Sequence, residues 1–192
     1  MKKQMDDYIM DNENPYYNFN LALEYEKIDQ KTSAISYFLR AAERSHDTDK
    51  TLSYESLIHM GILYDSQGKR GKTALSCWRK AVTLLPQRPE AYYHISRYHN
   101  WFSDYDQAYV LSSLGLEFCN FENDLQRTSY LRPGTYKTCL LFEKGLSGWW
   151  WGKVDESKSI FRDLKINHID DLPDYHKNIL NTYIEEKMKI EL

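Results

Sequence analysis

The stretch SQGKRGKT at 66–73 has the residue types of a phosphate-binding loop, so nucleotide chemistry is the first hypothesis to weigh. Such a loop needs G-x4-G-K-[ST] after a buried strand, because backbone amides then cradle the phosphates. Gly71, Lys72 and Thr73 supply the second half, but Ser66 stands where the first glycine is required. No later strand ending in aspartate follows to hold magnesium. We therefore interpret the stretch as a turn and expect no cofactor.

Two Asp-x-Asp tripeptides could hold a metal ion beside a sugar nucleotide if they lay at the edge of a sheet. They are Asp47-Thr48-Asp49 and Asp104-Tyr105-Asp106. The first falls in a linker and the second in a turn before a predicted helix. Aspartate is common at both places, because it caps helices and hydrogen-bonds turns. We expect a structural role for both tripeptides.

Histidine and cysteine spacings add no further candidate for catalysis. The six histidines form no metal-binding spacing, and no Ser-His-Asp or Cys-His arrangement can be argued. The three cysteines, Cys77, Cys119 and Cys139, are an odd number without a CxxC pair. This pattern argues against a disulfide framework and a zinc site, and indicates a reducing compartment. We expect no catalytic residues, no bound metal and no enzymatic activity.

A recurring order of small and large residues indicates instead that the chain repeats itself. Ala34, Phe38 and Ala41 have the spacing small-x3-large-x2-small, and Ala74, Trp78 and Ala81 repeat it. Weaker versions occur at 108–115 and 157–164. A second signature lies upstream of each set, as in Ala22-x2-Tyr25 and Gly61-x2-Tyr64. Both spacings are helical, so each unit is predicted to be two helices joined by a short polar turn.

Small residues at a helix crossing let two antiparallel helices approach closely, and the large residue then fills the space beside them. The predicted fold class is all-α, a right-handed superhelical stack of helix-turn-helix repeats with a C-terminal capping helix. The alternative is a helical bundle without repeats. The expected parts are a potentially flexible N-terminal segment at 1–13, four pairs and a cap, with an insertion near 120–136. The pairs are at 14–46, 54–86, 89–119 and 136–165, and the cap at 173–190.

This pattern resembles the tetratricopeptide repeat, whose units are helix pairs of about thirty-four residues. The resemblance covers roughly residues 14–165; the second and third units match best and the fourth is degenerate. A narrower resemblance exists to the helical region appended to some family 2 glycosyltransferases. It is carried by NPYYNFNLALEYEK, LLPQRPEAYYHISRYH and LLFEKGLSGWWWGKVDES. We expect no catalytic domain like that of those enzymes, because 192 residues leave no room for its alternating strands and helices.

In a repeat stack of this kind, the first helix of each pair lines the concave side. Residues there that the packing signature does not use are predicted to bind a partner in the groove. The lining is aromatic and mixed in charge, and the alternative is that about half of the aromatics cover core. The predicted groove residues are Tyr16, Phe19, Asn20, Glu55, His59, Asp65, Tyr93, Arg97, Asn100, Trp101, Trp149 and Trp150.

Three consecutive tryptophans in GWWWGK at 148–153 are a separate signal. Successive residues of a helix point about 100° apart, so the three indoles cannot all face one core. We expect at least one to be exposed, or buried against another chain or the capping helix. An exposed apolar surface commonly marks an interface.

Charge and hydropathy then narrow the class of partner. The net charge of −3 is mild, so the chain as a whole does not attract nucleic acid or anionic membranes. No stretch approaches the roughly 20 apolar residues of a membrane span, and the N-terminus is not a secretory signal. We expect a cytoplasmic, non-catalytic scaffold that binds another protein; self-association is compatible with the pattern. The alternative is an accessory or substrate-recognition module of a glycosyltransferase system.

Overall fold

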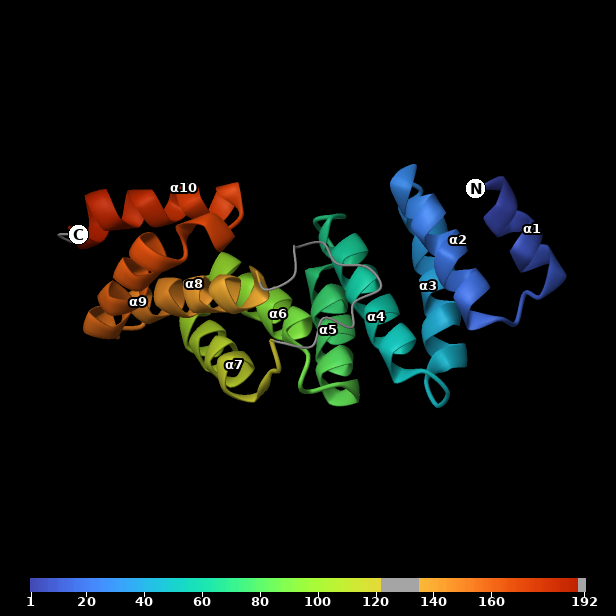
Figure 1. Ribbon diagram of the computed structural model, residues 1–192, viewed down its shortest axis with the longest axis horizontal. Coiled ribbons are helices and arrows are strands. Elements are labelled where there is room, and N and C mark those ends of the chain that lie inside the picture. The colour runs from blue at the N-terminus through green and yellow to red at the C-terminus, as the bar shows by residue number, and fades with distance from the viewer. Residues whose placement is uncertain (122–134, 190–192) are drawn as a thin grey trace. The chain divides into compact units, whose positions relative to one another are not determined.

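Consecutive helices packed in antiparallel pairs make up the protein, as the repeat pattern predicts. The computed structural model describes residues 1–121 and 135–189, and these described residues contain no β-strand. The chain forms two compact units, Met1–Leu85 and Pro86–Leu192. Within each unit, the two helices of a pair lie side by side (Figure 1).

The first unit contains a short leading helix and two helix pairs. Helix α1 is Lys2–Met10, α2 is Pro15–Lys27, α3 is Lys31–Ser45, α4 is Lys50–Asp65 and α5 is Gly71–Leu84. Helix α1 occupies most of the segment that we expected to be potentially flexible. It is held by the N-terminal amino group, which lies 2.5 Å from Glu24, and by Tyr8, whose ring packs edge-on against Tyr37 at 5.3 Å.

Local sequence signals set the starts of α2 and α4. Pro15 is the first residue of α2, where its missing N–H and fixed φ suit a helix start. The side chain of Asn14 accepts hydrogen bonds from the amides of Tyr16 and Tyr17. Asp49, from the first Asp-x-Asp tripeptide, accepts a hydrogen bond from the Leu52 amide at 3.0 Å and so caps α4.

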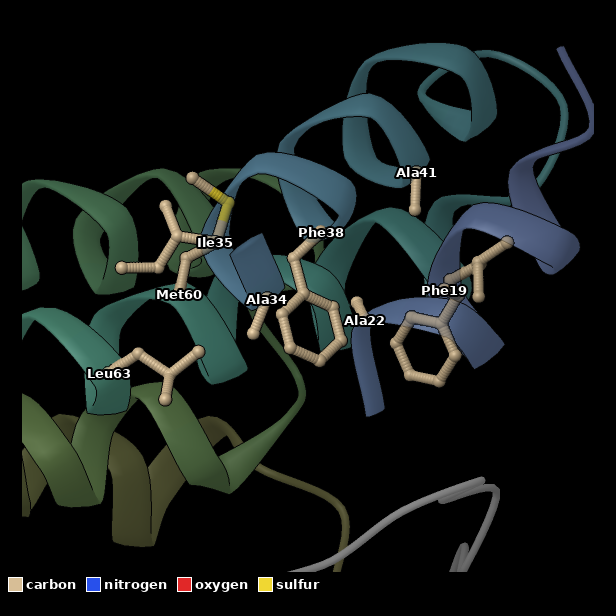
Figure 2. Close-up of a cluster of buried hydrophobic side chains, with 9 residues drawn as sticks. Phe19, Ala22, Ala34, Ile35, Phe38, Ala41, Met60 and Leu63 are labelled. Carbon is tan, nitrogen blue, oxygen red and sulfur yellow. The ribbon is translucent and has the colours of Figure 1, made fainter. Parts of the chain in front are cut away.

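The core of the first unit lies between α2, α3 and α4 (Figure 2). Phe19 and Phe38 meet edge to face with their ring centroids 5.4 Å apart, and Ala22 lies beside them. The cluster combines large rings with alanines, so the helices approach closely around the aromatic side chains. Its buried members are Phe19, Ala22, Ala34, Ile35, Phe38, Ala41, Leu52, Met60 and Leu63.

The second pair of this unit shows why the small residue of each signature is required. A Cβ atom placed on Gly61 of α4 would lie 2.1 Å from Nε1 of Trp78 on α5. Trp78 is therefore packed directly against the backbone of the neighbouring helix, and only glycine leaves room for it. Ala74 and Ala81, on the same face of α5, are completely buried.

The second unit contains two further pairs and a cap. Its helices are α6 (Pro89–Trp101), α7 (Tyr105–Phe118), α8 (Thr135–Trp150), α9 (Val154–Asn167) and α10 (Asp174–Thr182). A short 3-10 helix, η1 (Ile169–Asp171), precedes α10, and a π-helical segment, η2 (Tyr183–Met188), follows it. The insertion expected near 120–136 falls almost entirely outside the described residues.

Small residues perform the same task in the second unit. A Cβ atom on Gly145 of α8 would lie 2.4 Å from the ring of Phe161 on α9. In the third pair the roles are reversed, since a Cβ atom placed on Gly115 of the second helix, α7, would lie 2.9 Å from Cβ of Tyr92 on α6. This reversal explains why the signature at 108–115 lacks an aromatic residue: the ring comes from the first helix.

The capping helix at the C-terminal end of the second unit is amphipathic. Its buried residues are four apart and form one row: His176, Leu180, Ile184 and Met188. Tyr175, next to His176 in the first turn of α10, is exposed. Lys165 of α9 donates a hydrogen bond to Asn181 at 2.7 Å and ties the cap to the last pair.

Candidate interaction surface

On α2, the first helix of the first pair, two of the predicted groove residues are exposed. Tyr16 and Asn20 lie four residues apart on α2 and therefore on the same face. The Tyr16 hydroxyl donates a hydrogen bond to Asp49 Oδ2 at 2.8 Å, which holds the ring at the surface next to the start of α4. This face of α2 offers one ring and one amide to a partner.

Three other predicted groove residues of the first unit are buried, contrary to our expectation. Phe19 belongs to the core cluster, and His59 lies between Phe38, whose ring is 4.7 Å away, and the carboxylate of Glu26, 2.9 Å from its Nδ1. Glu55 is also buried. The physical reason is that α4 is covered on nearly all sides, so helical phase alone does not leave its residues open.

Asp65 is followed by the stretch SQGKRGKT at 66–73, whose sequence resembles a phosphate-binding loop. Asp65 is the last residue of α4 and is partly exposed; its carbonyl accepts a hydrogen bond from the Gly68 amide at 2.9 Å. Gly68 has φ of 74°, a left-handed conformation that glycine adopts without strain. The segment thus follows a helix and not a strand, which agrees with its interpretation as a turn.

In the second unit, α6 presents two exposed residues of the predicted set. Arg97 is exposed, and Trp101, four residues later on the same face, is 76% exposed. Arg97 forms no ion pair with any described residue, so its guanidinium is available to a ligand. Asn100 is partly buried, and its Nδ2 donates hydrogen bonds to the carbonyl and to Oε2 of Glu143 at 3.0 and 2.7 Å.

Tyr93, on the same helix, is buried, where we expected a groove residue. Its ring packs 5.8 Å from Tyr136 of α8, and its hydroxyl lies 3.4 Å from Nε2 of His176 on α10. Burial, followed by the charge of nearby Glu143, raises the pKa of the Tyr93 phenol. Tyr93 therefore remains a neutral part of the packing between α6, α8 and α10.

A polar cluster around Glu143 joins these three helices, and sequence reasoning missed it. Glu143 and His176 are both 3% exposed, with His176 Nε2 lying 3.4 Å from Glu143 Oε1. The His176 ring also meets Phe142 edge-on at 4.7 Å. The available signal was the spacing of four from His176 to Leu180, which places this histidine on the apolar row of the cap.

Asp104, from the second Asp-x-Asp tripeptide, does not cap α7 as we expected. It stands at the N-cap position, but its side chain makes no capping hydrogen bond. Its Oδ2 lies instead 2.7 Å from Nδ1 of His99. The buried imidazole of His99 needs a polar partner, and the aspartate across the turn supplies one.

The three tryptophans divide as their helical phase requires. Trp149 is partly buried, whereas Trp150 and Trp151 are 49% and 44% exposed. Trp150 stacks on Tyr105 with the centroids 5.9 Å apart, and its Nε1 donates a hydrogen bond of 2.7 Å to the Tyr183 hydroxyl in η2. The indole of Trp150 thus contacts the segment that follows the capping helix, and about half of its surface remains exposed to a ligand.

The described residues contain neither a cluster of metal-binding side chains nor a helix able to span a membrane. No group of three or more histidine, cysteine or acidic side chains there is arranged to hold a metal ion. Cys77, Cys119 and Cys139 are all free thiols. Across residues 1–121 and 135–189, no helix is both long and apolar enough to span a membrane.

Several solved structures share this fold, and they define the class of architecture. The chain is similar to YrrB, described as a TPR protein with an unusual peptide-binding site, with a TM-score of 0.63 and 18% identity over 97% of this chain and 86% of that one. It is also similar to the MamA RS-1 ArsTM double mutant, with a TM-score of 0.60 and 13% identity over 91% of this chain and 86% of that one.

A further similarity is to MamA MSR-1 C2, with a TM-score of 0.52 and 16% identity over 89% of this chain and 97% of that one. No protein-family model and no curated protein matches the sequence. At these identities the likeness concerns the fold alone. The protein is therefore an all-α stack of helix pairs like those of tetratricopeptide repeat proteins.

Proposed function

We propose that the protein binds another protein, and does so through exposed side chains on the first helices of its pairs. The observation that carries the proposal is the pair of Arg97 and Trp101 on α6. Both are exposed on one helix face, and Arg97 has no carboxylate partner among the described residues. Tryptophan and arginine are the residue types most enriched where binding energy concentrates.

The first unit offers a smaller version of the same arrangement on α2. Tyr16 and Asn20 supply a ring and an amide at the same i, i+4 spacing. The hydrogen bond to Asp49 already holds the Tyr16 ring at the surface, so ordering this ring on binding costs little conformational entropy. The similarity to YrrB, a protein described as having a peptide-binding site, supports an extended or helical peptide as the ligand.

Affinity capture with three single variants tests this function. Arg97→Ala and Trp101→Ala should keep the melting temperature of the wild type and lose the captured protein. Phe118→Ala is the matched control, because Phe118 is an exposed aromatic residue on a second helix, α7. A partner retained by both α6 variants, or lost equally in the control, would contradict the proposal.

A second candidate function is an accessory or substrate-recognition module of a glycosyltransferase system. It rests on the sequence resemblance described above and on the half-exposed indoles of Trp150 and Trp151. Intrinsic tryptophan fluorescence during titration with oligosaccharides tests it directly. A saturable change that is lost in Trp150→Phe would favour this candidate, and no response to any sugar would leave the protein ligand as the preferred partner.

A further inference from the structure

A second surface, distinct from the first helices, lies on the outer side of α5 and in the turn before it. Five basic side chains gather there, all exposed, and we name them the α5 basic patch: Lys69, Arg70, Lys72, Arg79 and Lys80. Neither α5 nor the turn 66–70 contains an acidic residue. Figure 1 shows α5 as the last helix of the first unit.

The patch is not neutralised within the part of the chain that the structure describes. None of its five cations forms an ion pair with a described carboxylate; Arg70 lies instead over the ring of Tyr64, 5.6 Å from its centroid. Lys72 and Arg79 are two turns apart and face the same side of α5, and Lys80 lies beside them. The helix also begins without a side-chain cap, so its positive N-terminal dipole adds to the field.

Concentrated charge of this kind is unusual on a chain whose net charge is −3. Five unpaired cations repel one another, and this repulsion costs stability unless a ligand relieves it. The chain contains enough acidic residues to form ion pairs with these five cations, but the acidic residues lie outside α5 and its turn. A local excess of positive charge that remains without ion pairs in the folded protein therefore indicates a binding surface for an anionic partner.

The surroundings of the patch decide which anion fits. No exposed large hydrophobic side chain among the described residues lies on α5 or its turn, so the patch lacks the apolar anchor of a membrane-bound helix. Tyr64, the ring beside it, is only partly exposed and is covered by Arg70, so no platform for stacking nucleobases is present.

The length of the patch distinguishes between the two remaining anionic partners, a nucleic acid and an acidic segment of a protein. From Lys72 to Lys80 the patch is about 12 Å long, given the rise of an α-helix. A nucleic acid carries negative charge far beyond that length, and the acidic excess of the remaining surface would repel it. A short run of aspartate and glutamate residues places its charge within the patch alone. We infer that the α5 basic patch docks a short acidic segment of another protein.

A fluorescent peptide with a run of about four glutamates, which in extended form spans about 13 Å, tests the inference by anisotropy at about 0.15 M salt, where long-range attraction is screened. In Lys72→Glu/Arg79→Glu the affinity should fall about tenfold or more, because two ion pairs are lost and repulsion replaces them. Raising the salt concentration should weaken wild-type binding. Arg97→Ala should bind the peptide normally, since this surface is separate from that of the proposed function.

Lys3→Glu/Lys50→Glu is the matched control, with the same charge change at exposed sites of the first unit outside the patch. It should bind the peptide like the wild type. If the reversal variant melts earlier than the wild type, Lys72→Gln/Arg79→Gln replaces it. A single-stranded thymidine oligonucleotide or a vesicle containing phosphatidylserine that binds tighter than the peptide would overturn the inference. Equal loss in the control, or no peptide binding, would also overturn it.

Discussion

Arg97 and Trp101 illustrate how a single helix turn separates core from surface in this protein. Tyr93, one turn earlier on α6, is buried against α8 and α10, while the two later residues are exposed. All three share one face of the helix, so the difference comes from what covers each turn. Residues at the far end of α6 are the ones that a partner can reach.

Substituting Arg97 should separate binding from stability. Arg97→Ala removes an exposed side chain that has no ion pair among the described residues, so the free energy of unfolding should change by less than about 0.5 kcal/mol. Partner binding should weaken strongly if the guanidinium is a contact. Thermal melting and a binding assay on the same variant check both parts, and a normal affinity would remove Arg97 from the site.

Lys72 allows a test of the nucleotide hypothesis, because it is the lysine of the stretch at 66–73 that resembles a phosphate-binding loop. Lys72→Ala should also change stability by less than about 0.5 kcal/mol, since its side chain is exposed in the first turn of α5. We expect no saturable ATP binding in the wild type. ATP binding that this variant abolishes would restore the nucleotide hypothesis.

At the scale of the elements, each helix pair depends on a large side chain packed against a small one. Trp78 of α5 fills the space above Gly61 of α4, and Phe161 of α9 fills that above Gly145 of α8. Glycine is required at these crossings because any Cβ atom would overlap the ring. The pairs should therefore tolerate exchanges on their outer faces far better than at these contacts.

Two substitutions on α5 should destabilise the first unit for opposite reasons. Ala81 is fully buried, so Ala81→Leu should overpack the crossing and cost about 1–3 kcal/mol. Trp78→Ala should leave a cavity and cost about 3–5 kcal/mol. Urea unfolding followed by circular dichroism gives both values. Wild-type stability in either variant would mean that the helices of this pair do not cross where the structure places them.

At the scale of the whole molecule, the buried tyrosines make the stability of the fold depend on pH in the alkaline range. Burial raises the pKa of several phenols above the ordinary value of about 10, namely those of Tyr37, Tyr92, Tyr93, Tyr109 and Tyr183. For Tyr109, burial and then the hydrogen bond to Glu156 raise the pKa to about 12. The folded protein thus keeps protons that the unfolded chain releases.

The sign of the resulting pH dependence follows from linkage. Below about pH 10 both states hold the phenolic protons, and stability is unaffected; above it the unfolded state binds fewer protons, so stability falls as the pH rises toward 12. Melting temperatures measured across this range should fall, and less steeply in Tyr109→Phe. Tyr175→Phe, an exposed control, should follow the wild type. A flat profile would contradict the expectation.

The repeat spacing alone was enough to predict an all-α stack of helix pairs. Small and large residues recur at helical intervals, and a helix crossing imposes that order locally, within one pair. Pro15 and Pro89, at helix starts, and Gly68, in a turn, act over only a few residues, so their meaning is also visible in the sequence. The resemblance to tetratricopeptide repeats followed from these short-range rules.

Only the tertiary structure decided which first-helix residues are accessible. Phe19 and Tyr93 have the same helical phase as the exposed residues Tyr16 and Arg97, yet each is covered by a helix that is distant in sequence. The pairing of His176 with Glu143 likewise joins two residues that no local pattern relates. Burial depends on the whole set of helices packed around a side chain, whereas periodicity reports only the helix to which that side chain belongs.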